Sequence, residues 1–283
     1  MVIQWKEIWS IKSDLVQGKT FFKNQARHLV YPSVSVFIPV APKDYWIVSK
    51  CVQSLRLNLL NPISELIICG KQSLQLDKIC AELGCVFVDE SAIAPILKED
   101  LDRDFNQLDR TSWIFQQLLK LNSIDVVSEE NFLVWDSDTC LVRKVGFVVN
   151  EKYVLEYGQR KHIPYLSSSQ ALLGKLPTFD FSFTCHKMLF NKKYLAEMKE
   201  MIEKRFQKSW YEAYLGVVDT NEVSSISEYE IYSLFLLRDY PEKVILRNWR
   251  NLAESSYGSN FRRKLLSLWF VSISYHAYSQ DIV

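Results

Sequence analysis

The sequence predicts an α/β fold with a mostly parallel sheet flanked by helices, and two observations support this prediction. Short, continuously apolar segments recur along the first half of the chain, as expected of strands buried on both faces of a sheet. Segments with apolar residues at helical spacing alternate with them, which is the order required by parallel strands joined by helical connections.

The first predicted strand covers residues 34–42, where β-branched and aromatic residues are followed by prolines. Two more strands are predicted in the first third of the chain, and the segment FLVWDSDTCLV at 132–142 is predicted as the fourth. The acidic stretch 98–104 is expected to be mobile. The remaining strands are expected at 65–70 and 85–91, and helices at 45–60, at 72–83 and from Thr111 or Ser112 onward.

The second half of the chain has a looser pattern and is expected to recognise the partner. A strand-like run at 179–185 follows a loop-rich stretch, and helices are predicted at about 192–208 and 228–238. Residues 1–30 are predicted as a helical extension, and residues 251–283 as a helical C-terminal segment. Everything between them is assigned to one domain.

Composition narrows the class of protein. The 283 residues contain 34 Lys and Arg against 33 Asp and Glu, so no overall positive field attracts nucleic acid. The six cysteines form no Cys-x-x-Cys pair, which suits free thiols in a reducing compartment. The N-terminal segment carries charges throughout, unlike a signal peptide, and no run approaches the about 20 apolar residues of a membrane span. We therefore expect a cytoplasmic protein.

Two aspartates, Asp136 and Asp138, directly follow the apolar part of the fourth strand. In open α/β sheets, ligands bind beyond the carboxyl ends of the strands. If extended geometry persists through Ser137, both carboxylates point the same way. Close carboxylates repel unless a cation compensates, and Mg²⁺ or Mn²⁺ does so together with phosphate oxygens and water. The alternative is that the pair only caps the next turn.

Two enzyme classes use such a motif. Phosphatases of the haloacid dehalogenase type have Asp-x-Asp-x-Thr on their first strand. Here Cys140 occupies the threonine position and three predicted strands precede the motif. Nucleotide-sugar glycosyltransferases of the GT-A fold place Asp-x-Asp after a nucleotide-binding half-sheet. The order of elements fits this second class.

Four stretches together resemble a bacterial glycosyltransferase-like family of unknown function: DRTSWIFQQLLKL, FLVWDSDTCLV, FSFTCHKMLF and SISEYEIYSLFL, in this order. The resemblance covers roughly residues 33–247. It implies a GT-A-like, Rossmann-type fold over residues 31–250, with a nucleotide-sugar-binding half at 31–142 and an acceptor half at 143–250. It also implies transfer of a sugar from a nucleotide-diphosphate donor to a hydroxyl of a glycan or lipid-linked glycan, with Mn²⁺ or Mg²⁺ as cofactor.

Candidate donor contacts lie in two places. Arg110, Gln117 and Lys120 share roughly one face of the helix that leads into the Asp-x-Asp strand. The two cations could neutralise a diphosphate, with Asp136 also on the donor side, although a solvated polar face is the alternative. The turn after the first strand usually meets the base or ribose, which makes weak candidates of Pro39, Val40 and Asp44.

Glu228 is the predicted base. Ser227 suits an N-cap, and Glu230 three residues later completes a capping box, which leaves Glu228 at the first helical position and free to point outward. In inverting GT-A enzymes, an acidic residue at a helix start deprotonates the acceptor hydroxyl. The alternatives are a base role for Glu230, glutamates that only complement the helix dipole, and a retaining mechanism.

His186 is predicted to complete the metal shell with Asp136 and Asp138, to donate to the leaving diphosphate or to bind the acceptor. His276 and His162 are weaker candidates for the metal and for a substrate contact. The C-terminal stretch NFRRKLLSLWF combines three cations with apolar residues, so it could contact the inner face of a membrane or simply pack as a terminal helix. The rival to an enzyme is a non-catalytic carbohydrate- or nucleotide-binding protein of the same fold.

Overall fold

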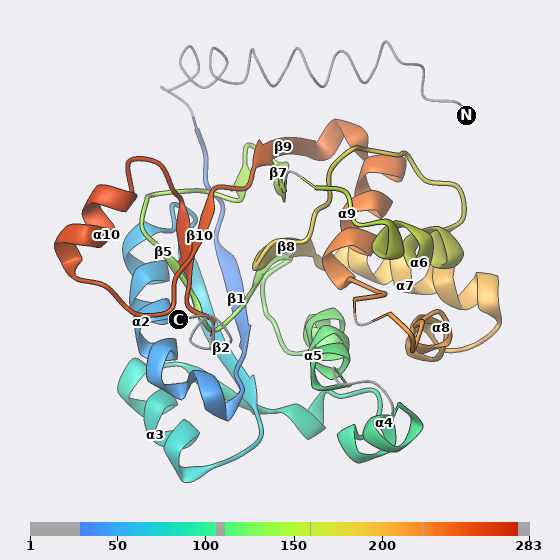
Figure 1. Ribbon diagram of the computed structural model, residues 1–283, viewed down its shortest axis with the longest axis horizontal. Coiled ribbons are helices and arrows are strands. Elements are labelled where there is room, and N and C mark those ends of the chain that lie inside the picture. Colours follow the sequence, from blue (N-terminus) through green and yellow to red (C-terminus); the bar gives the residue numbers. More distant parts are fainter. Residues whose placement is uncertain (1–28, 106–110, 159, 223, 277–283) are drawn as a thin grey trace.

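The structure is a computed structural model that describes residues 29–105, 111–158, 160–222 and 224–276 (Figure 1). Most of the predicted N-terminal extension, and Arg110, lie outside these residues. The described strands are β1 Val34–Pro39, β2 Ile63–Gly70, β3 Val86–Asp89, β4 Asn131–Trp135, β5 Thr139–Leu141, β6 Val148–Val149, β7 Lys152–Tyr157, β8 Lys187–Asn191, β9 Val244–Asn248, β10 Asn251–Ala253 and β11 Ser272–Ser274. The described α-helices are α2 Tyr45–Asn58, α3 Leu74–Leu83, α4 Lys98–Asp104, α5 Thr111–Asn122, α6 Ile163–Leu173, α7 Lys192–Phe206, α8 Trp210–Gly216, α9 Glu228–Asp239 and α10 Asn260–Leu266.

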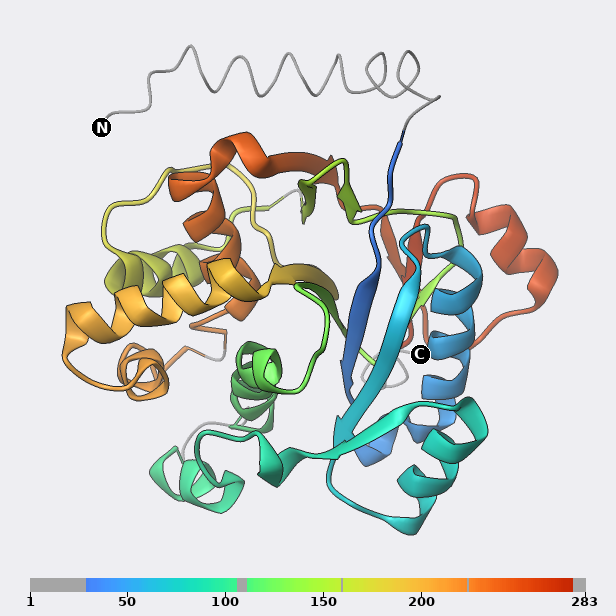
Figure 2. The ribbon, with the colours of Figure 1, turned by 180° about the vertical axis from the view of Figure 1, so that it is seen from behind.

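The central sheet confirms the predicted α/β class. Its order is β3-β2-β1-β4-β8, and its first four strands are parallel, whereas β8 runs antiparallel to β4. Strand β1 is buried along its whole length, which explains why every residue but Ser35 is apolar, and the hydroxyl of Ser35 donates to Glu65. Helices α2 and α3 lie on one side of this sheet, and α5, α7 and α9 on the other (Figures 1 and 2).

Gly70 ends β2 where the sheet meets the loop after β1. A Cβ at this position would lie 2.6 Å from the carbonyl oxygen of Val40, so the close approach of the two backbones requires glycine. The glycine at the end of β2 therefore has a packing cause.

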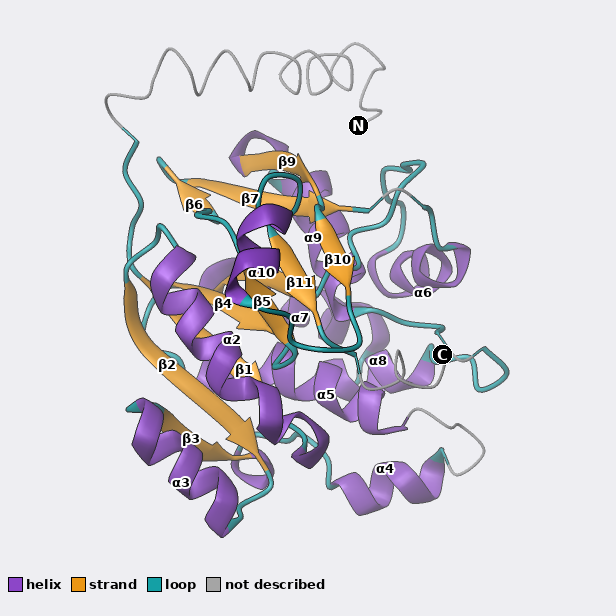
Figure 3. Ribbon diagram, turned by 60° about the vertical axis from the view of Figure 1, so that its left-hand side comes forward, coloured by secondary structure: helices purple, strands orange, loops and turns teal. Residues whose placement is uncertain are grey.

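The predicted fourth strand is divided. Strand β4 stops at Trp135, the backbone N–H of Thr139 donates to the carbonyl of Asp136 at 3.1 Å, and β5 then joins a different sheet of order β10-β11-β5. Extended geometry therefore does not persist through Ser137, so the condition under which both carboxylates would point the same way is not met. The third sheet, which is also small, has the order β6-β7-β9 (Figure 3).

Three other stretches differ from expectation. Residues 98–104 form helix α4, with Leu101 buried and Lys98 paired with Asp102 at 2.7 Å. Residues 179–185 form no strand, because the N–H of Phe183 donates to the Glu230 carboxylate and strand pairing begins only at Lys187. The rings of Phe179, Phe181 and Phe183 pack on one another. The segment from 251 onward contains β10 and β11 as well as the short helix α10.

Among the described residues, no helix combines the length and apolar composition needed to cross a bilayer.

Candidate functional site

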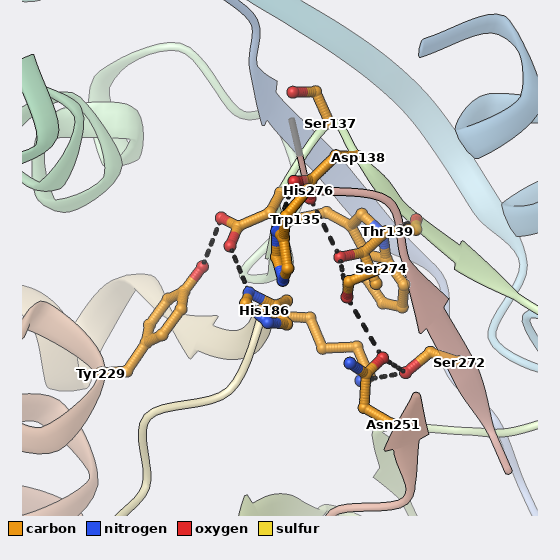
Figure 4. A network of polar contacts seen from close by, with 12 residues as sticks. Trp135, Ser137, Asp138, Thr139, His186, Tyr229, Asn251, Ser272, Ser274 and His276 are labelled. Atoms are coloured by element: carbon orange, nitrogen blue, oxygen red, sulfur yellow. Dashed lines mark hydrogen bonds and ion pairs between the residues drawn. The ribbon is translucent and has the colours of Figure 1, made fainter. Parts of the chain in front are cut away.

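The turn of residues 136–138 lies between two distant parts of the chain. The backbone N–H of Asp136 donates to the carbonyl of His186 at 3.0 Å, beside β8. The backbone N–H of Tyr275 donates to the carbonyl of Asp138 at 2.9 Å, just after β11. The central and C-terminal sheets therefore meet at this turn, at the carboxyl end of β4 (Figure 4).

The carboxylate of Asp136 contacts three neighbouring side chains. Oδ1 lies 2.7 Å from the ammonium of Lys120 and accepts from the hydroxyl of Tyr229 at 3.4 Å, while Oδ2 lies 3.1 Å from Nδ1 of His186. Burial alone would raise the pKa of Asp136, but Lys120 and His186 outweigh it and hold the pKa well below its ordinary value. Asp136 is therefore an anion whose charge is already balanced within the protein.

Lys120 bridges two carboxylates. Its ammonium lies 2.9 Å from Oε1 of Glu228 as well as 2.7 Å from Asp136, and 4.5 Å from the centre of the Tyr229 ring. Its side chain is 3% exposed. Burial lowers the pKa of Lys120, but the two carboxylates outweigh this and raise it well above its ordinary value. The residue predicted to meet a diphosphate thus serves first as a buried counter-ion.

Glu228 does not point outward as expected. Its side chain is 3% exposed because ten of the twelve residues of α9 are buried and Lys120 holds the carboxylate from α5. Burial raises the pKa of Glu228, although Lys120 opposes this shift. Of the two acids beside Lys120, Asp136 is therefore the stronger.

The N-terminus of α9 is capped differently from the predicted capping box. The hydroxyl of Ser227 accepts from the N–H of Glu230 at 3.4 Å, but the Glu230 carboxylate accepts instead from the hydroxyl of Ser182 and the N–H of Phe183. Oε1 of Gln117 accepts the N–H of Glu228 at 3.0 Å. Gln117 is fully buried, so it fixes the start of α9 and is not placed to contact a ligand.

The second aspartate pairs with a residue from the end of the described chain. Oδ2 of Asp138 lies 2.9 Å from Nδ1 of His276, and the hydroxyl of Thr139 donates to Oδ1 at 3.3 Å. The rings of His276 and His186 are 4.7 Å apart between centroids. Two carboxylates and two imidazoles thus gather at this turn, including the weaker candidate His276.

A chain of hydrogen bonds supports Asp138 from below (Figure 4). The hydroxyls of Thr139 and Ser274 lie 2.8 Å apart, and the side-chain carbonyl of Asn251 accepts from Ser274 at 3.2 Å and from Ser272 at 2.7 Å. Lys187, which is buried and ion-paired with Glu156, donates to Ser272 at 3.0 Å. These bonds fix the C-terminal strands that carry His276.

The remaining predicted residues have other surroundings. Asp44 is buried and accepts from the hydroxyl of Ser137 at 2.9 Å, so it braces the turn from α2, and burial raises its pKa. Pro39 and Val40 are buried at the end of β1. His162 lies 2.7 Å from the carbonyl of Ser224 and packs on Tyr165, with ring centroids 4.1 Å apart.

Sequence reasoning missed Trp249. Its indole packs on the ring of His186 at 5.3 Å between centroids, in an edge-on arrangement. Its Nε1 is buried and has no hydrogen-bond partner among the described residues. No local motif marks this residue, because it reaches the site only through the pairing of β9 with β7.

The donor set partly suits a divalent cation. Within the described part of the chain, no three His, Cys, Asp or Glu side chains converge as a preformed metal site. The carboxylate of Asp138 and the imidazole of His276 are nevertheless adjacent, with Oδ2 and Nδ1 2.9 Å apart. Mg²⁺ is commonly held by one or two protein ligands together with phosphate oxygens and water, so this pair fits such an ion. Asp136 fits less well, because Lys120 already occupies the position of its counter-ion.

Solved structures with a similar arrangement include mouse xyloside xylosyltransferase 1 in its apo form, which is 11% identical over 88% of this chain and 99% of that chain, with a TM-score of 0.45. Galactosyltransferase LgtC in complex with donor and acceptor sugar analogs is 12% identical over 86% of this chain and 87% of that chain, with a TM-score of 0.44. Glucosyl-3-phosphoglycerate synthase from Mycobacterium tuberculosis, in complex with Mn²⁺, uridine diphosphate and glucosyl-3-phosphoglycerate, is 12% identical over 76% of this chain and 69% of that chain, with a TM-score of 0.42. TM-scores this low carry no inference about activity.

A comparison with curated proteins gives no match. Residues 64–271, which include the Asp-x-Asp turn, Lys120, His186 and Glu228, match the model of a family of unknown function (DUF6492), and the chain belongs to this family.

Proposed function

We propose that this protein is a glycosyltransferase of the GT-A type that moves a sugar from a nucleotide-diphosphate donor to a hydroxyl of a glycan or glycolipid. One observation supports this most directly. The Asp-x-Asp turn gathers two carboxylates and two imidazoles at the carboxyl ends of parallel strands, which is where open α/β sheets bind their ligands.

We assign substrate contact to the more exposed side chains of the site and a supporting role to the buried ones. The side chains of Asp136 and His186 are 21% and 24% exposed. Those of Lys120 and Glu228 are each 3% exposed. Asp136 therefore accepts hydroxyl groups of the donor, and His186 donates to its diphosphate. Lys120 keeps Asp136 ionised from behind. A diphosphate contact by Arg110, which lies outside the described residues, stays part of the proposal.

Asp138 and His276 are the residues that would hold Mn²⁺ or Mg²⁺, with oxygens of the donor diphosphate and water completing the coordination. When bound, the ion would neutralise the negative charge that develops on the leaving diphosphate. Asp136 and His186, the other predicted ligands, would join this set only by exchanging their present contacts.

The role of Glu228 distinguishes two mechanisms. In an inverting transfer, Glu228 takes the proton of the acceptor hydroxyl, and its raised pKa suits a base. The acceptor must then replace Lys120 at the carboxylate. In a retaining transfer, Glu228 only holds Lys120. The burial of Glu228 behind Lys120 supports the second role, although the sequence favoured the first.

A non-catalytic binding protein is the second candidate. The observation that favours it is that both aspartates are already paired, Asp136 with Lys120 and Asp138 with His276. A binder and an enzyme would share the ligand pocket but differ in turnover.

The proposal is tested by thermal unfolding of the full chain with nucleoside diphosphates and nucleotide sugars, each with and without Mn²⁺. A ligand at about a hundred times its Kd stabilises the folded state by about 2.7 kcal/mol. Release of nucleoside diphosphate in the presence of glycan acceptors then separates the enzyme from the binder. If no nucleotide raises the melting temperature under either condition, the donor site proposed here does not exist.

A further inference from the structure

An exposed apolar surface surrounds α10. The side chains of Phe261, Leu265, Leu268 and Trp269 are 79%, 48%, 63% and 59% exposed. They account for four of the twelve large exposed hydrophobic residues in the described structure, yet fall within nine consecutive positions. Single exposed apolar residues are ordinary on a protein surface, whereas a contiguous group marks an interaction site. We call residues 260–269 the α10 surface.

The geometry of the segment presents these side chains together. Phe261 and Leu265 are one helical turn apart and share a face of α10. Leu268 and Trp269 continue in the turn that follows, in which their N–H groups donate to Leu265 and Leu266. Helix α10 lies at the outer edge of the molecule, beyond the small sheet that contains β10 and β11 (Figures 1 and 3).

Positive charge is concentrated on the same segment. Residues 250–276 contain the four cations Arg250, Arg262, Arg263 and Lys264 but only the one carboxylate of Glu254, whereas the whole chain is nearly neutral. Arg262 pairs with Glu254 at 2.8 Å, and the guanidinium of Arg263 lies 3.8 Å from the centre of the Tyr257 ring. Lys264, the next residue, is exposed. The cations therefore border the apolar side chains instead of lying on another face.

We propose that the α10 surface docks on a membrane that contains anionic lipid. Aromatic and aliphatic side chains enter the headgroup region of a bilayer, while adjacent lysines and arginines are attracted to anionic headgroups. A second copy of the chain fits this surface less well. A symmetric contact between two α10 surfaces would bring like charges together, which costs several kcal/mol.

Docking here would also fix the position of the candidate site. The chain runs from α10 directly into β11 and then to His276, which contacts Asp138 at 2.9 Å. A membrane-held α10 would therefore keep the site close to acceptors carried on lipid. The docking itself does not depend on the proposed sugar transfer.

The test measures binding of the full chain to sedimented vesicles, either of phosphatidylcholine alone or with about a third of phosphatidylglycerol. We expect binding to the anionic vesicles and at least about tenfold weaker binding to the neutral ones. The double variant Phe261→Ser, Trp269→Ser should lower the partition coefficient at least about tenfold, because two apolar anchors are lost. Lys264→Ala should lower it about fivefold.

The matched control changes the same kinds of residue on another helix. Leu74 is 90% exposed and Lys78 lies one turn later on α3, so the double variant Leu74→Ser, Lys78→Ala should bind as the unchanged protein does. Equal binding to both vesicle types, equal loss in the control, or no binding would overturn the proposal. Concentration-dependent dimerisation that the Phe261→Ser, Trp269→Ser variant abolishes would identify a second copy as the occupant instead. None of these results bears on nucleotide binding.

Discussion

The ammonium of Lys120 lies 2.7 Å from Asp136 and 2.9 Å from Glu228, and this one buried cation joins helix α5, the Asp-x-Asp turn and helix α9. The first aspartate of the motif is thereby neutralised without a metal ion. Lys120 therefore affects both the stability of the fold around the site and the charge state of Asp136 and Glu228.

Replacing Lys120 should destabilise the fold. Lys120→Met leaves the buried Glu228 carboxylate without its cation and removes the lysine from Asp136, and removing one partner of a buried pair costs about 3–5 kcal/mol. Urea unfolding measures the change, with Lys78→Met on the exposed face of α3 as the control, since its side chain is 77% exposed. The double variant Lys120→Met, Glu228→Gln should recover part of the loss. A change below about 1 kcal/mol in the single variant would contradict the role of Lys120 as a buried counter-ion.

Glu228→Gln keeps the shape of the side chain but removes its charge. If Glu228 only holds Lys120, turnover should fall by less than about tenfold and its pH profile should keep its shape. Loss of a general base lowers the rate by about 10²–10⁴. A loss in that range, in a variant that still binds the donor, would return Glu228 to the role of base in an inverting transfer.

The second aspartate should control the response to metal. Asp138→Asn is expected to remove the Mn²⁺-dependent part of the nucleotide-induced shift in melting temperature, because Asp138 and His276 are the adjacent pair proposed to hold the ion. Asp180→Asn, at an exposed position, should leave the shift unchanged. An undiminished Mn²⁺ effect in Asp138→Asn would place the ion elsewhere.

Trp249→Phe tests whether the indole N–H recognises a ligand. The substitution keeps an aromatic ring beside His186 but removes a buried donor that has no partner in the described structure. We expect unfolding stability within about 1 kcal/mol of the unchanged protein, or slightly above it. Nucleotide-sugar affinity should fall about fivefold to tenfold, as expected for one lost hydrogen bond. Isothermal titration calorimetry measures the affinity, and unchanged binding would exclude a role for the N–H.

Lys199 on α7 predicts a pH dependence of stability. Burial lowers its pKa from 10.5 to about 8, although its ammonium donates to Asn122 at 2.9 Å. Between these two pH values the folded protein releases a proton that the unfolded chain keeps, so stability should rise as the pH rises from 8 toward 10.5. Lys199→Met should abolish this rise and stabilise the protein at neutral pH by about 1–3 kcal/mol. The exposed Lys204→Met is the control, and chemical unfolding at several pH values reads both variants.

The sequence predicts the fold correctly where the spacing of apolar residues along the chain matches the burial of those residues in the structure. Strand β1 is almost entirely apolar because both faces of the sheet are covered, and the aspartates lie just after the carboxyl end of β4, as predicted. Gln117 and Lys120 share a helix face as their spacing indicates, but that face meets the buried helix α9. Nothing local distinguishes a buried polar face from a ligand-binding one.

The other differences arise from contacts between residues far apart in sequence. The alternating phenylalanines at 179–183 have the period of a strand, yet the backbone there bonds to the Glu230 carboxylate and to the N–H of Gly158 instead of to a neighbouring strand of the central sheet. Strands β10 and β11 have three residues each, which is too short for a pattern to emerge. His276 gains its significance from Asp138, and Trp249 from His186, and neither pairing is visible along the chain.

The contact between Asp138 and His276 spans 138 positions. Closing so long a loop costs entropy before any contact repays it, so this end of the site should assemble late during folding. For the same reason it should be among the first regions to open in transient fluctuations, well before the central sheet exchanges its amide hydrogens. Asp136 directly follows a strand of the central sheet, so its part of the site should form with the core. The part that contains His276 should form only when the C-terminal strands have packed against residues 136–138.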